Sequence, residues 1–179
     1  SAKARDEVRE AAARLGYRPN LLYRSLRSQH TKTIGLIVPN LHVNSTAANT
    51  EVLESLAWES GYHLFIGYTQ NDINKEQALL QDFVSRRVDG VILVVGSDGP
   101  ERPELEYLLT HNIPIVAIGE ISGYNCPSAT VDYKAGGVLA ARHLAELGHE
   151  RVAALTLPFG AYGVEERAAG FIETARQCR

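Results

Sequence analysis

A short basic run near the start of the chain carries the residues with the clearest chemical potential. Leu26 stands between Arg24 and Arg27, and the run follows Pro19 and Asn20. In a short helix, a leucine can wedge between base steps of a DNA minor groove while neighbouring cations neutralise or read the groove. The same residues would also suit an ordinary connector whose leucines pack against the rest of the protein, so composition alone leaves both interpretations open.

Charge is distributed unevenly along the 179 residues. Residues 1–32 contain eight Lys and Arg against three acids, a net charge of +5, whereas the remaining residues carry a net charge of −8. A basic segment joined to an acidic body is typical of a nucleic-acid-binding arm, although a solvated helix face would carry the same charges. The asymmetry therefore favours DNA or RNA as a partner without deciding the matter.

Motifs for catalysis, nucleotide binding and metal binding are weak. No Gly-x-Gly-x-x-Gly, Walker loop or Gly-x-Ser-x-Gly elbow occurs in the sequence. His143, Glu146 and His149 are spaced three apart, unlike the His-Glu-x-x-His pattern of zinc sites. Cys126 and Cys178 are far apart, as expected of free thiols in a reducing compartment. We therefore expect no enzyme activity, no cofactor and no metal.

Hydropathy and composition also bear on location. No apolar run approaches the roughly 18–20 residues that a membrane-spanning helix needs, and no charged-then-apolar leader opens the chain. We therefore expect a cytoplasmic protein with no membrane contact. Methionine is absent altogether, including at position 1, so we expect a processed chain or a fragment.

Strand and helix patterns alternate from Thr33 onward. The continuous apolar run Val91–Val95, for example, is typical of a strand covered on both faces. The patterns predict a parallel, doubly wound α/β sheet, in which ligands bind beyond the carboxyl ends of the strands. Helices at 5–15 and from Asn20 to about 26 are expected to precede it. The expected strands are 33–38, 62–68, 89–95, 113–118, 129–132 and 151–156, and the expected helices are 47–60, 75–86, 102–111, 133–147 and 164–177.

The order of several short motifs resembles the lactose-repressor (LacI/GalR) family of bacterial transcription regulators. The resemblance starts with Val8–Asn20 and goes on in Arg24–Arg27 and Thr31–Pro39. Each piece is weak by itself, but so many pieces in the right order make the resemblance specific over nearly the whole chain. The later pieces are Arg86–Ile92, Ile113–Val116, Val131–Gly137, Leu144–His149 and Arg167–Phe171.

The resemblance implies a helix-turn-helix headpiece and a hinge helix joined to a two-lobed core like that of periplasmic sugar-binding proteins. Residues 1–30 would be a partial DNA-binding headpiece with the hinge helix. Residues 31–148 would be the first effector-binding lobe, and residues 149–179 the start of the second. The first two headpiece helices and most of the second lobe would then be missing from this chain.

The resemblance also assigns DNA contacts. It implies that Leu26 wedges into the central minor groove of an operator and that Arg27 contacts the groove beside it, next to Arg24. Tyr17 and Asn20 would lie close to the phosphates. These assignments favour the DNA-binding interpretation of the basic run over the connector.

Effector contacts follow from the resemblance together with the expected sheet. Arg167 matches an arginine that grips the effector, and a guanidinium fork suits hydroxyls or a carboxylate; it could also be an ordinary surface charge. Asp132 would face the same cleft, or would cap the helix that starts near Tyr133. The expected effector site comprises Asn44, Ser45, Thr46, Gly119, Asp132 and Arg167. This site departs from the family pattern in two places.

The two departures concern the residues that would touch the ligand. Many relatives have Asn-Pro-Phe-Phe after the first strand, and those aromatic rings stack on the ligand, whereas this chain has Val43-Asn44-Ser45-Thr46. Gly119 stands where many relatives carry Asp. We therefore expect effector affinity to rest on hydrogen bonds rather than on stacking, with a sugar, a sugar phosphate or a related metabolite as the ligand.

Together these features predict an effector-responsive transcription regulator, acting as a repressor, that binds operator DNA as a homodimer. The helix at 47–60 offers Val52, Leu53, Leu56 and Trp58, more apolar surface than one sheet face needs, and the family resemblance implies a dimer seam there. The alternative is a soluble sugar-binding receptor built on the same core. The basic run and the missing leader count against that alternative.

Overall fold

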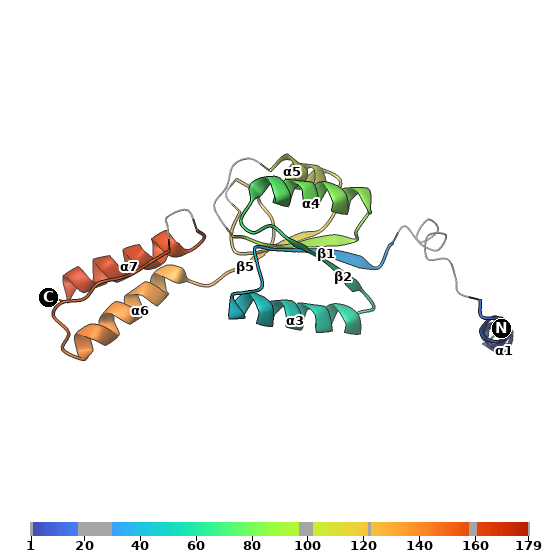
Figure 1. Ribbon diagram of the computed structural model, residues 1–179, viewed down its shortest axis with the longest axis horizontal. Coiled ribbons are helices and arrows are strands. Elements are labelled where there is room, and N and C mark those ends of the chain that lie inside the picture. The colour runs from blue at the N-terminus through green and yellow to red at the C-terminus, as the bar shows by residue number, and fades with distance from the viewer. Residues whose placement is uncertain (1, 18–29, 97–101, 122, 158–160, 179) are drawn as a thin grey trace. The chain divides into compact units, whose positions relative to one another are not determined.

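The structure is a computed structural model that describes residues 2–17, 30–96, 102–121, 123–157 and 161–178 (Figure 1). The chain forms two compact units, Ser1–Thr31 and Lys32–Arg179. In the first unit, α1 covers Ala2–Arg14. Gly16 follows it with a φ of 62°, in the left-handed region, as expected of a glycine that terminates a helix. The second short helix expected from Asn20 lies outside the described residues.

A parallel sheet forms the centre of the second unit. Its strands are β1 (Thr33–Val38), β2 (His63–Tyr68), β3 (Gly90–Val94), β4 (Ile115–Ile118) and β5 (Ser128–Ala129). They pair in the order β2-β1-β3-β4-β5, and every pair is parallel. The predicted fold class is confirmed, because each strand returns to the sheet through a crossover connection.

Helices cover both faces of this sheet. Figure 1 shows α3 (Asn44–Glu59) on one face and α4 (Ile73–Ser85) with α5 (Pro103–Thr110) on the other. Under α4, the Phe83 ring lies where a Cβ at Gly35 would stand, so glycine at position 35 lets helix and strand approach closely. The fully buried side chains of this core include Leu36, Ile37, Leu80, Phe83, Leu93 and Leu108.

The last two helices pack along each other. In Figure 1, α6 (Tyr133–Glu146) and α7 (Val164–Gln177) lie side by side. A Cβ at Gly137 would overlap the carbonyl oxygen of Arg167, and a Cβ at Gly170 would overlap that of Lys134. The two glycines therefore allow a backbone-to-backbone contact that no other residue would permit.

Two predicted strands differ from the structure. The strand expected at 151–156 is wrong, because residues 152–157 have no regular secondary structure. Leu155 and Leu157 are fully and two-thirds exposed, and no strand in the described part of the chain pairs with this segment. A strand needs a neighbour for its hydrogen bonds, and sequence pattern alone does not supply one. The strand expected at 129–132 shortens to β5, and Asp132 instead caps α6.

The first residues of two helices also differ from their predicted positions. α4 begins at Ile73, and its cap is Asp72, whose carboxylate accepts a hydrogen bond from the Asn74 N–H at 2.9 Å. α3 begins at Asn44, three residues before the predicted start. Among the described helices, none has the length and apolar character that crossing a bilayer requires.

Candidate functional site

The carboxyl ends of β1, β3 and β4 meet at one edge of the sheet, because the strands are parallel and adjacent. After β1, the Asn40 side-chain oxygen accepts hydrogen bonds from the backbone of His42 and Val43, and α3 begins at once. Asn44 and Ser45 are exposed in the first turn of this helix. They therefore sit on a helix end rather than in the loop that the sequence analysis expected.

Gly119 follows β4 in a conformation that requires glycine. Its φ is 107°, and its N–H donates to the Ala129 carbonyl at 2.9 Å. A Cβ there would stand 3.0 Å from the Cε1 atom of Tyr162 and 3.0 Å from the Cβ of Val95. Tyr162 thus occupies the space that a side chain at position 119 would need.

Tyr162 is held by hydrogen bonds at both ends. Its N–H donates to the Gly96 carbonyl at 3.3 Å, and its hydroxyl accepts from the Glu120 N–H at 2.8 Å. The hydroxyl also lies 3.0 Å from the Thr130 Oγ1 atom. The ring packs against the apolar core of the sheet. Tyr162 therefore fastens the start of α7 to the ends of β3 and β4.

A pocket of about 510 Å³ opens beside this tyrosine, and we call it the tyrosine pocket. It contains one of the predicted effector residues, Asp132. That side chain caps α6 by accepting a hydrogen bond from the Ala135 N–H at 2.8 Å, so the capping role left open by the sequence is realised. The lining of the tyrosine pocket is Glu120, Thr130, Val131, Asp132, Tyr133, Lys134, Tyr162 and Glu166.

Arg167 lies next to the tyrosine pocket without lining it. Its side chain is exposed, and its guanidinium carbon is 4.8 Å from the centre of the Tyr133 ring. The Tyr133 ring in turn meets Tyr162 edge-on, with ring centres 5.5 Å apart. Three of the predicted residues, Gly119, Asp132 and Arg167, therefore lie around Tyr133 and Tyr162. The lining of this pocket does not include Asn44, Ser45 or Thr46.

Neither Tyr133 nor Tyr162 was predicted from the sequence as a site residue. Tyr162 belongs to none of the recognised motifs, and hydrogen bonds join it to Glu120 and Thr130, 42 and 32 residues away. The available signal was indirect: a glycine at position 119 leaves space that a large side chain elsewhere can fill. Only the contact itself shows which side chain fills it.

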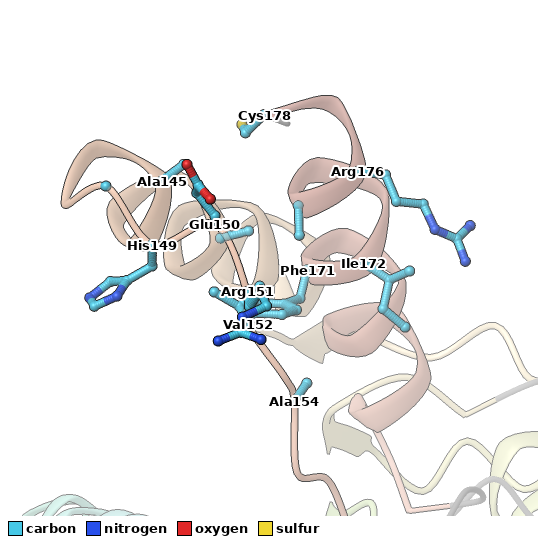
Figure 2. Close-up of a pocket in the computed structure, with 13 residues that line it drawn as sticks. Ala145, His149, Glu150, Arg151, Val152, Ala154, Phe171, Ile172, Arg176 and Cys178 are labelled. Carbon is cyan, nitrogen blue, oxygen red and sulfur yellow. The ribbon is translucent and has the colours of Figure 1, made fainter.

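A larger pocket, of about 810 Å³, lies between α6, α7 and the segment 148–154 (Figure 2). Figure 2 shows His149 and Arg176 projecting away from its centre, whereas Phe171 and Val152 belong to its apolar lining. None of the predicted effector residues lines it. Part of its wall is formed by residues of the exposed segment 151–157. We therefore do not assign the effector to this pocket.

The remaining predicted residues can be placed only in part. Tyr17 ends the first described stretch, residues 2–17, and is 64% exposed. Asn20, Arg24, Leu26 and Arg27 lie outside the described residues. Among the residues that the structure describes, no three His, Cys, Asp or Glu side chains are grouped to hold a metal ion.

Comparison with known proteins identifies the fold and the family. Residues 31–179 match the family described as periplasmic binding proteins and sugar binding domain of LacI family. The HTH-type transcriptional repressor PurR of Erwinia tasmaniensis is 35% identical over 175 residues, which cover 94% of this chain and 51% of that protein.

Two solved structures extend the comparison. A periplasmic binding protein/LacI transcriptional regulator of Alkaliphilus metalliredigens, complexed with D-xylulofuranose, is 31% identical with a TM-score of 0.72 and covers 82% of this chain and 53% of that one. The Lac repressor dimer bound to operator and the anti-inducer ONPF covers 99% of this chain and 54% of that one, with a TM-score of 0.81. At 21% identity, it supports the fold alone.

The matches cover most of this chain but only part of its relatives. The chain spans about half the length of the curated relatives it matches. The family match, however, covers most of this chain and includes every strand of its sheet. The resemblance found in the sequence is therefore confirmed, and the chain belongs to the lactose-repressor (LacI/GalR) family, with residues 31–179 in its periplasmic-binding-protein-like, sugar-binding region.

Proposed function

We propose that this chain is part of a cytoplasmic, effector-responsive transcription regulator, acting as a repressor, that binds operator DNA as a homodimer. The observation that carries this proposal is the joining of two parts. A core that matches the family's sugar-binding region over residues 31–179 follows a separate basic unit at residues 1–31. A basic unit of this kind supplies phosphate neutralisation, and the core supplies control by a small molecule.

The first unit has the features of a partial DNA-binding headpiece. Val8 in α1 and Leu15 just after it are 68% and 78% exposed, which is expected of a helix whose apolar side packs against further helices. Tyr17, exposed three residues after α1, is available to approach phosphates. In the proposal, Asn20 does the same, and the hinge residues Arg24, Leu26 and Arg27 enter the minor groove.

The core has an outward face suited to a second copy. On α3, Thr50 and Ala57 are buried toward the sheet, whereas Val52, Leu56 and Trp58 are each more than half exposed. Exposed apolar side chains of this size on a structured helix mark an interaction surface. We propose this face as the dimer interface of the first lobe, residues 31–148.

The effector would bind where this lobe meets the second, which we propose to start at residue 149. The proposed residues are Asn44, Ser45, Thr46, Gly119 and Asp132 from the first lobe, and Arg167 from the start of the second. Binding would shift the population toward a closed arrangement of the lobes, and the linked hinge would change its affinity for the operator. No bond is made or broken by the protein in this mechanism.

A soluble sugar-binding receptor on the same core remains the second candidate. The relative solved with D-xylulofuranose supports a sugar-binding core equally under both functions. The net charge of +5 over residues 1–32 favours the DNA-binding candidate, because a receptor has no use for a basic arm beside its core.

Selection from random double-stranded DNA with the complete gene product tests this function. We expect an enriched sequence with two-fold symmetry, because a symmetric dimer reads two related half-sites. The Leu26→Ala protein should bind the selected sequence more weakly by a few kcal/mol at most, with unchanged melting temperature. No enrichment of any sequence would leave the receptor as the better candidate. An enriched sequence without symmetry would reject the dimer.

A further inference from the structure

We propose that the tyrosine pocket is a subsite for a neutral, hydroxyl-rich ring such as an unphosphorylated sugar, and that it rejects phosphorylated ligands. This inference rests on the proposed effector-binding function and names the class of ligand. It differs from the expectation that effector affinity rests on hydrogen bonds rather than on stacking, and it chooses the free sugar over the sugar phosphate as the ligand.

Two aromatic rings form part of the wall of the pocket. Tyr133 and Tyr162 meet edge-on, with an angle of 87° between the ring planes, so the two rings present differently oriented surfaces. The apolar face of a sugar ring packs well against an aromatic face, and the surrounding polar groups then fix its orientation. Tyr133 is the first residue of α6, and Tyr162 lies two residues before α7.

The hydrogen bonds around Tyr162 determine what it can offer a ligand. Its hydroxyl accepts from the Glu120 N–H, and the Thr130 Oγ1 atom lies within hydrogen-bonding distance of both that hydroxyl and the Val131 carbonyl. The Tyr162 hydroxyl is therefore engaged by the Glu120 N–H and by Thr130. Its ring face is then the main surface that this residue offers to a ligand.

The charges that line the pocket disfavour an anion. Three carboxylates, those of Glu120, Asp132 and Glu166, stand against one lysine. That lysine, Lys134, places its Nζ atom 2.9 Å from the carboxylate of Glu173, which does not line the pocket. Even when Arg167 is included, acids outnumber cations by three to two. Carboxylates accept hydrogen bonds from sugar hydroxyls, but they repel a phosphate.

Two helices begin at the pocket, and a helix start would ordinarily favour an anion. Here the chain's own acids occupy those positions. Asp132 accepts from the Ala135 N–H in the first turn of α6, and the first turn of α7 contains Glu165 and Glu166. The positive ends of both helices are therefore largely compensated before any ligand arrives, which removes their advantage for a phosphate.

Gly119 makes this pocket wall possible. Any side chain there would meet the Tyr162 ring at about 3.0 Å, and the backbone at position 119 has a φ that disfavours other residues. The absence of a side chain at position 119 therefore makes room for an aromatic wall.

Titration of the complete gene product with matched sugar pairs tests the inference. The probes are D-ribose and ribose 5-phosphate, D-fructose and fructose 1-phosphate, D-glucose and glucose 6-phosphate, and inorganic phosphate alone, all at millimolar concentrations. Tyrosine ring resonances are followed by NMR, with Tyr133 and Tyr162 identified through their Phe variants. We expect at least one free sugar to shift both resonances, and its phosphate to bind at least about tenfold more weakly.

Charge variants separate selectivity from folding. Glu166→Gln removes a carboxylate from the pocket lining and should reduce the preference for the free sugar over its phosphate. Glu165→Gln, one residue away in the same helical turn and outside the lining, should leave that preference unchanged. The inference is overturned if a sugar phosphate or inorganic phosphate shifts the two resonances as strongly as the free sugar, if no free sugar shifts them, or if the two variants behave alike.

This outcome is distinguishable from failure of the proposed function. A protein that selects a symmetric DNA sequence, but whose two tyrosines respond to none of the free sugars, would remain a regulator with its effector elsewhere. A protein that binds a sugar at the two tyrosines but selects no DNA sequence would keep the subsite and lose the regulator.

Discussion

The sheet region, residues 32–129, and the helical pair of α6 and α7 differ in how completely each buries its own apolar side chains. In the sheet region, side chains such as Leu36, Phe83 and Leu93 are fully buried between β-strands and the covering helices. Around the helical pair, Leu139 and Leu157 remain about two-thirds exposed. A parallel sheet with helices on both faces closes its own core, whereas two helices without a paired strand do not.

The candidate site depends on both regions. Gly119 and Glu120 follow a strand of the complete region, whereas Tyr133 and Tyr162 belong to the start of the helical pair. The rigid edge of the sheet therefore positions the backbone, and the less complete region supplies the aromatic rings. Binding residues are often placed in this way, on segments that a well-packed scaffold holds in position.

Truncation of one buried and one exposed side chain should give the largest difference between the regions. Phe83→Ala removes a ring that is 0% exposed, and we expect the free energy of unfolding to fall by about 3–5 kcal/mol. Leu155→Ala removes a fully exposed side chain and should change it by less than about 0.5 kcal/mol. Urea denaturation followed by circular dichroism measures both. Equal losses would show that residue 155 is buried in solution.

Substitutions of two neighbouring glycines in α6 should change stability by intermediate amounts and in opposite directions. Gly137→Ala should destabilise the contact with α7 by about 1–3 kcal/mol, because its Cβ would overlap the Arg167 carbonyl. Gly136→Ala, with no atom within 4 Å of its Cβ, should stabilise the helix by about 0.5–1 kcal/mol. Hydrogen exchange of the α6 amides would report both changes. Stabilisation by both substitutions would mean that α6 and α7 do not pack closely.

The smallest difference between the two regions should appear in the rates at which their two cysteines are alkylated. Burial raises the pKa of the Cys126 thiol in the sheet region, so less of it is thiolate at neutral pH. Cys178, just after α7, is exposed. We expect iodoacetamide to label Cys126 more slowly in the folded protein, with the gap narrowing as pH rises past the pKa of Cys126. Mass spectrometry of timed samples measures the two rates, and equal rates at neutral pH would contradict the burial of Cys126.

Local pattern was sufficient for most of the fold. The apolar run Val91–Val95 predicted β3, and helical spacing between residues 164 and 177 predicted α7 with its observed bounds. Gly16, Gly61 and Gly148 follow α1, α3 and α6, and each has the positive φ that is common for a glycine just after a helix. These features depend on neighbours a few residues apart, so they can be read from the sequence alone.

Contacts between distant residues decided the rest. The apolar pattern at 151–156 predicted a strand, but no described strand lies beside it to complete the hydrogen bonds. For Asp132 the sequence left two roles open, and the hydrogen bond to Ala135 realises the cap. Tyr162 carries no local signal, because its role depends on the Glu120 amide and on the space above Gly119.

The sequence by itself therefore determined the family, the α/β class and the basic segment before the core, since motif order, periodicity and charge are properties of the chain as written. Only the tertiary structure decided which side chains surround the candidate site. Tyr162 joins the candidate site through a hydrogen bond with the Glu120 amide, 42 positions away, and a contact of that kind exists only once the sheet edge and the start of α7 have come together.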